Sequence, residues 1–175
     1  MTKKCYDSSM EEYVSNALVL GKYPVGERDA RYALFTERFG KMAGRTTSSR
    51  KITSKLAGHL EPGTVSKVRF VEKNGTRIVD ALKISHAGIA PRDLMLLERI
   101  LPDAQEDIEL WKLLTQEPFS WKTVLATLGW DPRGAVCAVC GGSAAWFFVP
   151  RQEFFCKTCV SKIGKSEVSL IQVNT

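Results

Sequence analysis

The sequence predicts an α+β protein in three parts: a five-stranded barrel, a small α-helical domain and a ribbon built on four cysteines. Strand-like segments separated by turn residues fill residues 1–85. Helical periodicity replaces them in residues 86–135, and two C-x2-C pairs follow in residues 136–160. The last residues, 161–175, are expected to form a tail that packs back on the helical domain.

The first half of the chain has the composition and the turn signals of β-structure. Asn74-Gly75 is the strongest short signal for a β-hairpin. Five strands with a helical insertion after the third are typical of the OB-fold, a small Greek-key barrel that binds oligonucleotides. The expected strands are 15–23, 29–40, 41–46, 63–73 and 76–84, with the helical insertion at 54–60.

The central part of the chain changes to helical spacing. Pro91 stands at a first-turn position and opens a leucine-rich segment with helical periodicity. A second helix is expected after Asp103, which we predict to be its N-cap. A third helix is expected over 119–130, with Gly129 as its end. The apolar stripes of these helices predict a small helical core.

The four cysteines near the end of the chain are spaced as metal ligands. Their pattern is C-x2-C-x15-C-x2-C, which lies within the range of four-cysteine zinc sites. Two such pairs can close a tetrahedron of thiolates around Zn²⁺, and four thiolates leave no open position, so the zinc is expected to be structural. A redox-active dithiol is the alternative. The candidate ligands are Cys137, Cys140, Cys156 and Cys159.

The net charge of +6 comes entirely from the first half of the chain. Residues 1–85 contain 16 Lys and Arg against 9 Asp and Glu, whereas residues 86–175 contain 9 against 10. A basic stretch without acids, 38–60, predicts a groove that follows the phosphates of nucleic acid, with a solvated loop as the alternative. The candidate DNA-binding residues are Arg38, Lys41, Arg45, Arg50, Lys51, Lys55, Lys67 and Arg69.

Aromatic side chains of the predicted barrel are candidates for stacking on bases. Proteins that bind single strands combine a basic groove with such aromatic platforms. The candidates are Tyr23, Tyr32, Phe35 and Phe39. Filling of the core is the alternative, and it is the expected role of Phe35.

The sequence gives no pattern of catalytic residues. It contains no P-loop, no clustered carboxylates and no nucleophile–base arrangement, so no enzyme activity is expected. The segment His59-Leu60-Glu61 matches part of the zinc deaminase signature, but Val136 stands where that signature has proline. No apolar run is long enough to cross a bilayer and no secretory signal is present, so we expect a cytosolic protein without a membrane partner.

Four segments, in this order, resemble the RecO family of bacterial recombination mediators. They are ALVLGKYPVGERDARYALFTERFGKM (17–42), SKLAGHLEPGTVSKVRF (54–70), VLATLGWDPRGAVCAVCGG (124–142) and FVPRQEFFCKTC (148–159). RecO chains are usually longer, and the length that is missing here falls in the helical region, 89–130.

The resemblance implies a cytoplasmic, nucleoid-associated bacterial protein that acts in DNA repair by homologous recombination. It implies that the protein binds single- and double-stranded DNA, anneals complementary strands and associates with RecR. With RecR it would help to load RecA onto DNA coated by the single-strand-binding protein SSB, whose C-terminal tail is a further candidate partner. The alternative is a zinc-ribbon adaptor that binds the transcription machinery or another protein and has a barrel that does not bind DNA.

Overall fold

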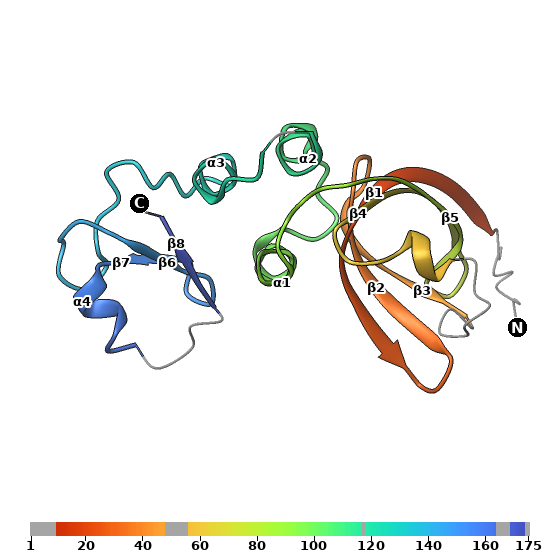
Figure 1. The fold of residues 1–175 in the computed structure, drawn as a ribbon, viewed down its shortest axis with the longest axis horizontal. Helices are drawn as coiled ribbons and strands as arrows, with labels where there is room; N and C mark the ends of the chain where they lie inside the picture. Colours follow the sequence, from red (N-terminus) through yellow and green to blue (C-terminus); the bar gives the residue numbers. More distant parts are fainter. Residues whose placement is uncertain (1–9, 48–55, 117, 164–168, 174–175) are drawn as a thin grey trace, which may run out of the picture.

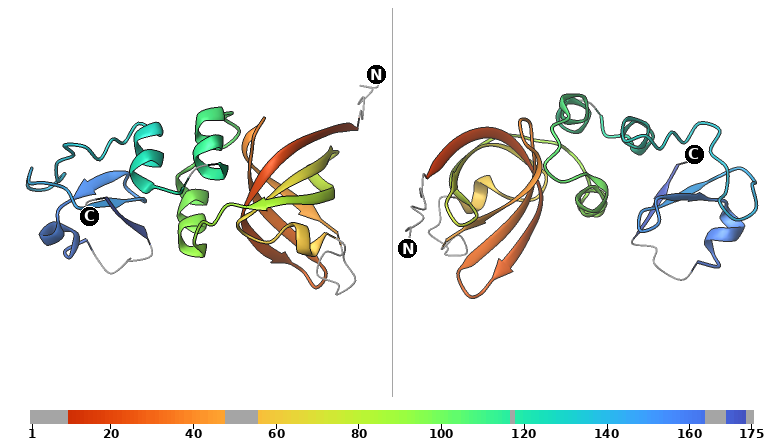
Figure 2. Two further views of the ribbon diagram at one scale, coloured as in Figure 1. Left: turned by 45° about the horizontal axis from the view of Figure 1, so that its top comes forward. Right: turned by 180° about the vertical axis from the view of Figure 1, so that it is seen from behind.

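The computed structural model describes residues 10–47, 56–116, 118–163 and 169–173. The barrel, the helices and the ribbon follow one another along the long axis of the molecule (Figure 1), and two further views show the same succession (Figure 2). The predicted α+β class, with a barrel of five strands and a four-cysteine cluster, is confirmed. No helix within the described ranges is long and apolar enough to cross a membrane.

Five strands close the barrel in the order β1-β2-β3-β5-β4. Neighbouring strands are antiparallel except β3 and β5, which meet in parallel at one pair of residues, Arg45 and Arg77. A short 3-10 helix, η1 (Ala57–His59), precedes β4 within the predicted helical insertion. The strands are β1 (Glu11–Val25), β2 (Asp29–Thr36), β3 (Gly40–Thr46), β4 (Thr64–Glu72) and β5 (Thr76–His86).

The second strand ends earlier than predicted because a side chain closes the turn after it. The Thr36 hydroxyl accepts a hydrogen bond from the Phe39 amide at 3.0 Å and donates one to the Gly40 carbonyl at 2.9 Å. These bonds satisfy backbone groups that a continued strand would have had to pair with β1. The chain therefore reverses over residues 37–39, and β3 begins at Gly40.

Two strands of the barrel are buried on both faces. Inward side chains such as Tyr32 and Leu34 fill the barrel. Outward side chains such as Leu18 and Phe35 belong to a second core that the helices complete, and the Phe35 ring lies 6.3 Å from the ring of Trp111. The barrel and the helices are therefore joined by a shared apolar core rather than by a flexible connection.

Three helices follow the barrel, and the first two pack against the outer face of β1 and β2. They are α1 (Pro91–Ile100), α2 (Ile108–Thr115) and α3 (Trp121–Thr127). The predicted N-cap of α2 is wrong: Asp107, not Asp103, accepts the hydrogen bond from the Leu110 amide, at 2.9 Å. The segment around Asp103 lies along β3 instead, where the Ala104 amide donates to the Lys41 carbonyl at 2.9 Å. Helix α2 can begin only after the chain has left the barrel.

The C-terminal part is a small three-stranded sheet with one short helix. Its strands are ordered β7-β6-β8, so the end of the chain adds a strand to the hairpin. Arg92 and Arg99 of α1 donate hydrogen bonds to the Leu170 carbonyl at 2.6 Å and to the Ser169 hydroxyl at 3.2 Å. The tail thus contacts both the ribbon and the helical domain. The elements are β6 (Trp146–Phe148), β7 (Glu153–Phe155), α4 (Lys157–Val160) and β8 (Leu170–Gln172).

The closest approach between the barrel and the helical segment is at Gly40. Its φ is +66°, and a Cβ atom there would overlap the backbone of Gln105. We expect Gly40→Ala to lower the free energy of unfolding by more than about 2 kcal/mol, because the left-handed strain and the overlap add. Urea denaturation measures this change.

Gly26→Ala is the matched control for this substitution. Gly26 has a similar φ of +61°, but no atom lies within 4 Å of the position of its Cβ. It should cost about 1 kcal/mol, from backbone strain alone. Equal costs at the two positions would contradict the close contact between β3 and the segment that precedes α2.

Candidate metal centre and nucleic-acid surface

The four predicted ligands form one compact cluster. The sulfur atoms of Cys137, Cys140, Cys156 and Cys159 all lie within 4.8 Å of one another, and those of Cys140 and Cys156 are 3.7 Å apart. A tetrahedral ion at the zinc–thiolate distance of about 2.3 Å would separate its sulfurs by about 3.8 Å. The cluster therefore fits a metal ion held by four thiolates.

Two tight turns present these cysteines. The Gly141 amide donates to the Cys137 carbonyl at 2.9 Å and closes the first turn, with Gly141 at a φ of +70° that glycine adopts without strain. Cys156 is the N-cap of α4, and its sulfur accepts the Cys159 amide at 3.4 Å. Backbone N–H groups thus point at the sulfurs, as they do where thiolates bind metal.

The charges of the cluster also favour a cation. Backbone N–H donors, first that of Cys156, lower the pKa of the Cys137 thiol to about 6. Hydrogen bonds with the Cys156 and Cys140 side chains, together with burial, raise the pKa of Cys159 to about 12. The Cys137 thiol thus ionises readily, whereas the Cys159 thiol is held protonated first by its hydrogen bonds to the neighbouring sulfurs and then by burial and the charge of Cys137. A bound dication offsets that negative charge and allows all four to ionise.

The deaminase constellation is not assembled. His59 and Glu61 lie at the barrel, whereas the cysteines surround β7 and α4 at the other end of the molecule (Figure 1). The Nδ1 atom of His59 accepts a hydrogen bond from the Lys83 amide at 3.2 Å, and Glu61 forms an ion pair with Lys22 at 2.7 Å. Both residues of the partial motif therefore stabilise the barrel.

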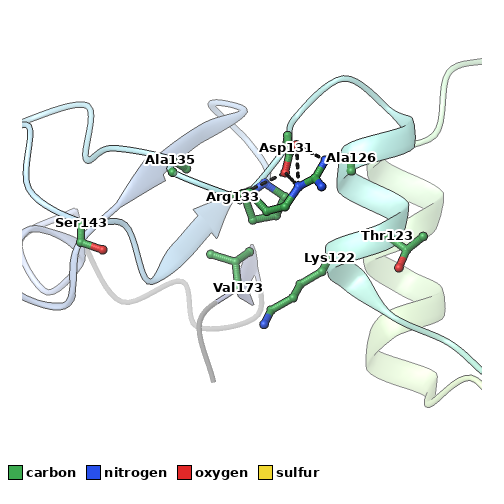
Figure 3. A pocket seen from close by; sticks show the side chains of 10 residues that line it. Lys122, Thr123, Ala126, Asp131, Arg133, Ala135, Ser143 and Val173 are labelled. Atoms are coloured by element: carbon green, nitrogen blue, oxygen red, sulfur yellow. Dashed lines mark hydrogen bonds and ion pairs between the residues drawn. The ribbon is translucent and has the colours of Figure 1, made fainter.

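A cleft of about 550 Å³ lies between α3 and the ribbon (Figure 3). Asp131 and Arg133 line it as a bidentate ion pair with a shortest distance of 2.7 Å, and this pairing lowers the pKa of Asp131. Lys122 of α3 points into the same cleft, opposite Val173. The Asp131–Arg133 pair holds the loop that leads from the helices into the first cysteine turn.

The five predicted basic residues that the structure describes do not form a single patch. Lys41 lies at the contact with the helices, where its ammonium group pairs with Asp103 at 3.2 Å and donates to the Glu98 carbonyl at 2.8 Å. Arg38 lies over the Phe39 ring at 5.3 Å. These residues occupy the turn end of the β2–β3 hairpin, and Arg45 lies at the other end.

The remaining predicted residues have separate positions. Lys67 and Arg69 lie on the outer face of β4, and Arg69 forms an ion pair with Glu12 at 3.0 Å. Arg50, Lys51 and Lys55 lie outside the described residues.

A row of three arginines crosses the barrel at the end where Arg45 lies. Arg31 of β2 is the register partner of Arg45 on β3, and Arg45 is the partner of Arg77 on β5. All three side chains are exposed, and none pairs with a carboxylate of the described residues. Like charges directly opposite one another destabilise a sheet. Such a row is typical of a surface that binds an anion.

The arginine row lines a groove of about 730 Å³. The tip of the β4–β5 hairpin, with Lys73, forms one wall, and Ala43 of β3 lies beside Arg45 in the lining. Arg31 and Arg77 were not among the predicted DNA-binding residues, because the prediction relied mainly on basic residues that are close together in the sequence. The available signal was strand alternation: Arg31 precedes the inward Tyr32, so it must point outward.

None of the four aromatic candidates for stacking lines this groove. Tyr32 and Phe35 are completely buried, and Phe39 packs edge-on against Tyr13 with ring centroids 4.8 Å apart. The Tyr23 hydroxyl donates to a Glu98 carboxylate oxygen, and burial together with this bond raises the pKa of Tyr23 to about 12. Each of these four side chains is either buried or in contact with another residue of the protein.

Comparison with known proteins agrees with the resemblance found in the sequence. A family model described as the N-terminal part of recombination protein O matches residues 10–87, which contain the barrel. The DNA repair protein RecO of Myxococcus xanthus is 31% identical over an alignment of 160 positions that covers 77% of this chain and 66% of that protein. RecO of Thermodesulfovibrio yellowstonii is 27% identical over an alignment of 186 positions, gaps included, that covers 90% of this chain and 74% of that protein. The chain belongs to the RecO family.

This RecO-family chain spans only about two thirds of the length of its Myxococcus relative. The family model covers the arginine row and the groove, because Arg31, Arg45 and Arg77 all fall within residues 10–87. The cysteine cluster lies beyond that match. The family model therefore supports the groove, whereas the metal centre is supported by the positions of the four cysteines.

Lys41 links the barrel to the helical segment. Its side chain is only 15% exposed, pairs with the Asp103 carboxylate and donates a hydrogen bond to the Glu98 carbonyl. We expect Lys41→Met to lower the free energy of unfolding by about 1–2 kcal/mol, because the Glu98 carbonyl loses its charged donor. Lys67→Met, at an exposed position of β4, should change it by less than about 0.5 kcal/mol. Equal effects in urea denaturation would contradict this difference.

Proposed function

We propose that this protein is a DNA-binding recombination mediator of DNA repair, and that its barrel holds the phosphate backbone in the groove lined by Arg31, Arg45 and Arg77. The single observation that carries the proposal is the arginine row. Three adjacent guanidinium groups repel one another in the free protein, and bound phosphates would relieve that repulsion. Membership of the RecO family supports DNA as the polyanion.

The geometry suits phosphates in particular. A guanidinium group can donate two parallel hydrogen bonds to one phosphate, which fixes the direction of the backbone as well as attracting it. Adjacent strands of a sheet lie about 4.8 Å apart, so the row offers a series of such donors across the barrel. Each phosphate that is neutralised releases condensed counterions, and this release drives binding.

The wider activities of the proposal come from the family. We propose that the protein anneals complementary strands, associates with RecR and helps to load RecA onto DNA coated by SSB. Double-stranded DNA and the SSB C-terminal tail are further proposed partners. We propose no enzyme activity and no nucleotide cofactor.

We also propose that the four cysteines hold a structural Zn²⁺. The support is the set of four thiolates and the 3.7 Å separation between the Cys140 and Cys156 sulfurs. A zinc ion bound there would link the first cysteine turn to α4 and supply folding energy to a small part of the chain.

The arginine row makes a quantitative prediction. Replacing Arg31, Arg45 and Arg77 together with alanine should weaken binding of a single-stranded oligonucleotide at low salt. The slope of log K against log salt should become shallower by about 2, because each phosphate contact on a single strand contributes about 0.7. Fluorescence anisotropy across a salt series measures both quantities.

The matched control removes the same charge elsewhere. Lys112, Lys157 and Lys162 are exposed on α2, on α4 and just after α4. Replacing these three with alanine should leave the slope nearly unchanged. If both triple variants flatten the slope equally, binding depends on net charge and not on the groove. If the native protein does not bind DNA at low salt, the adaptor alternative is favoured.

The metal proposal has its own test. Purified protein should contain one zinc per chain, and Cys156→Ser should release the metal and lower the melting temperature, because three thiolates leave the tetrahedron open. Cys5→Ser is the control, since Cys5 stands outside the two C-x2-C pairs of the sequence. Elemental analysis and calorimetry measure these effects. Full metal content in Cys156→Ser would contradict a four-thiolate site.

A further inference from the structure

We infer that the groove holds a single strand by its backbone alone and leaves the bases turned outward, unstacked and free to pair. This inference rests on the proposed function and concerns how the same groove would bind DNA. The bound strand would therefore differ in conformation from strands bound to most single-strand-binding barrels. In those complexes, successive bases stack on aromatic rings of the protein.

The lining of the groove contains cations, one carboxylate (Asp29) and small or aliphatic side chains. Four basic residues contribute to it, and no aromatic residue is found among its described lining. The rest is short or aliphatic, so no flat ring is available to a base. The lining residues are Met10, Asp29, Arg31, Ala43, Gly44, Arg45, Thr47, Val71, Lys73, Asn74, Gly75, Thr76 and Arg77.

One partly exposed aromatic residue, Tyr23, lies next to the arginine row but has a hydrogen bond that directs it elsewhere. Tyr23 is the register partner of Arg31 on β1, and it is 42% exposed. Its hydroxyl is bonded to the Glu98 carboxylate, which holds the ring towards α1. A phosphate approaching that carboxylate would be repelled, so the path of the backbone is expected to end at Arg31.

The parts of the chain beyond the described residues add little aromatic surface. Residues 48–55, which follow β3, contain no aromatic residue, and residues 1–9 contain only Tyr6. The experiment below therefore includes a Tyr6→Ala variant.

Backbone binding of this kind has a consequence for pairing. A base stacked on a protein ring must be released before it can pair, whereas a base turned away from the groove is available at once. Extended backbone on the arginine row would also hold the bases apart from one another. The same contacts would thus bind a strand and keep it ready for its complement.

The test probes the bases of a bound thymidine homopolymer with permanganate, which attacks the face of an unstacked thymine. We expect the full-length protein to leave the thymines less than about twofold protected relative to the free strand, whereas stacking on an aromatic ring would protect them at least about fivefold. The bound strand should also hybridise with a deoxyadenosine homopolymer at least as fast as the free strand does, measured by energy transfer. Tyr6→Ala should leave both results unchanged.

An engineered stacking platform calibrates the measurement. Ala43 is exposed on β3 beside Arg45. Ala43→Trp should protect the bound thymines and slow hybridisation, and Ala43→Leu, which adds bulk without a ring, should not protect them.

The outcomes separate this inference from the proposed function. Tight binding with thymines that the native protein protects would overturn the inference alone, and so would protection that disappears in Tyr6→Ala. Hybridisation that requires release of the protein would also overturn it. If the native protein does not bind the strand at low salt, the proposed function fails and the inference fails with it.

Discussion

Leu18 and Phe35 point away from the barrel interior and pack under the helices, whereas their neighbours Ala17 and Leu34 point into the barrel. Each apolar side chain of this kind stabilises the fold by about 1.5–3 kcal/mol when it is fully buried. The first two strands therefore contribute to two cores at once, and the helices cannot leave the barrel without exposing one of them. Because this half of the outer face is occupied, the proposed nucleic-acid ligand would have to use surface that lies beyond it.

The different surroundings of two basic residues on β3 follow from the helices covering only part of the outer face of the barrel. Lys41 and Arg45 both point outward from β3, four residues apart, which corresponds to about 13 Å along the strand. Lys41 lies at oxygens of the helical segment and pairs with Asp103, whereas Arg45 has Arg31 and Arg77 as register partners and forms no ion pair with a described residue. The helical segment thus pairs with the positive charge at one end of the face, whereas the arginines at the other end form no ion pair with a described residue. Adjacent charges of like sign cost stability, and the proposed polyanionic ligand would offset that cost.

The elements that were predicted best are those with local causes. The Asn74-Gly75 hairpin, the Pro91 start of α1 and the two cysteine turns each depend on a few adjacent residues, and the structure contains all of them. The N-cap of α2 was wrong because Asp103 is held by β3, a contact that is remote in sequence. The capping rule was correct, but two aspartates satisfied it and only tertiary contacts distinguished them.

The candidate groove also depends on contacts between residues that are remote in the sequence, and these contacts could not be predicted from local patterns. The basic stretch 38–60 suggested a groove made from one segment, but strand pairing separates its first members and joins Arg45 to residues from two other strands. A count of charges along the chain cannot find such a set, because register, not sequence distance, makes the three arginines neighbours. Alternation within each strand would have shown that Arg31 points outward, although it could not have shown which residue lies beside it.

The cysteine cluster and the groove lie next to different apolar cores, so we expect them to have different roles. Phe147 of β6 and Ile171 of β8 belong to the same apolar core as the helices, so the ribbon stabilises the helical domain through packing. The barrel interior is a different cluster, to which the ribbon contributes no side chain among the described residues. Loss of order around the cysteines should therefore spread into α1 and α3 before it reaches the strands that carry the arginines, because local unfolding follows units that share contacts. The cysteine cluster would then act on the groove only indirectly, through the helices that pack on the other half of the same face.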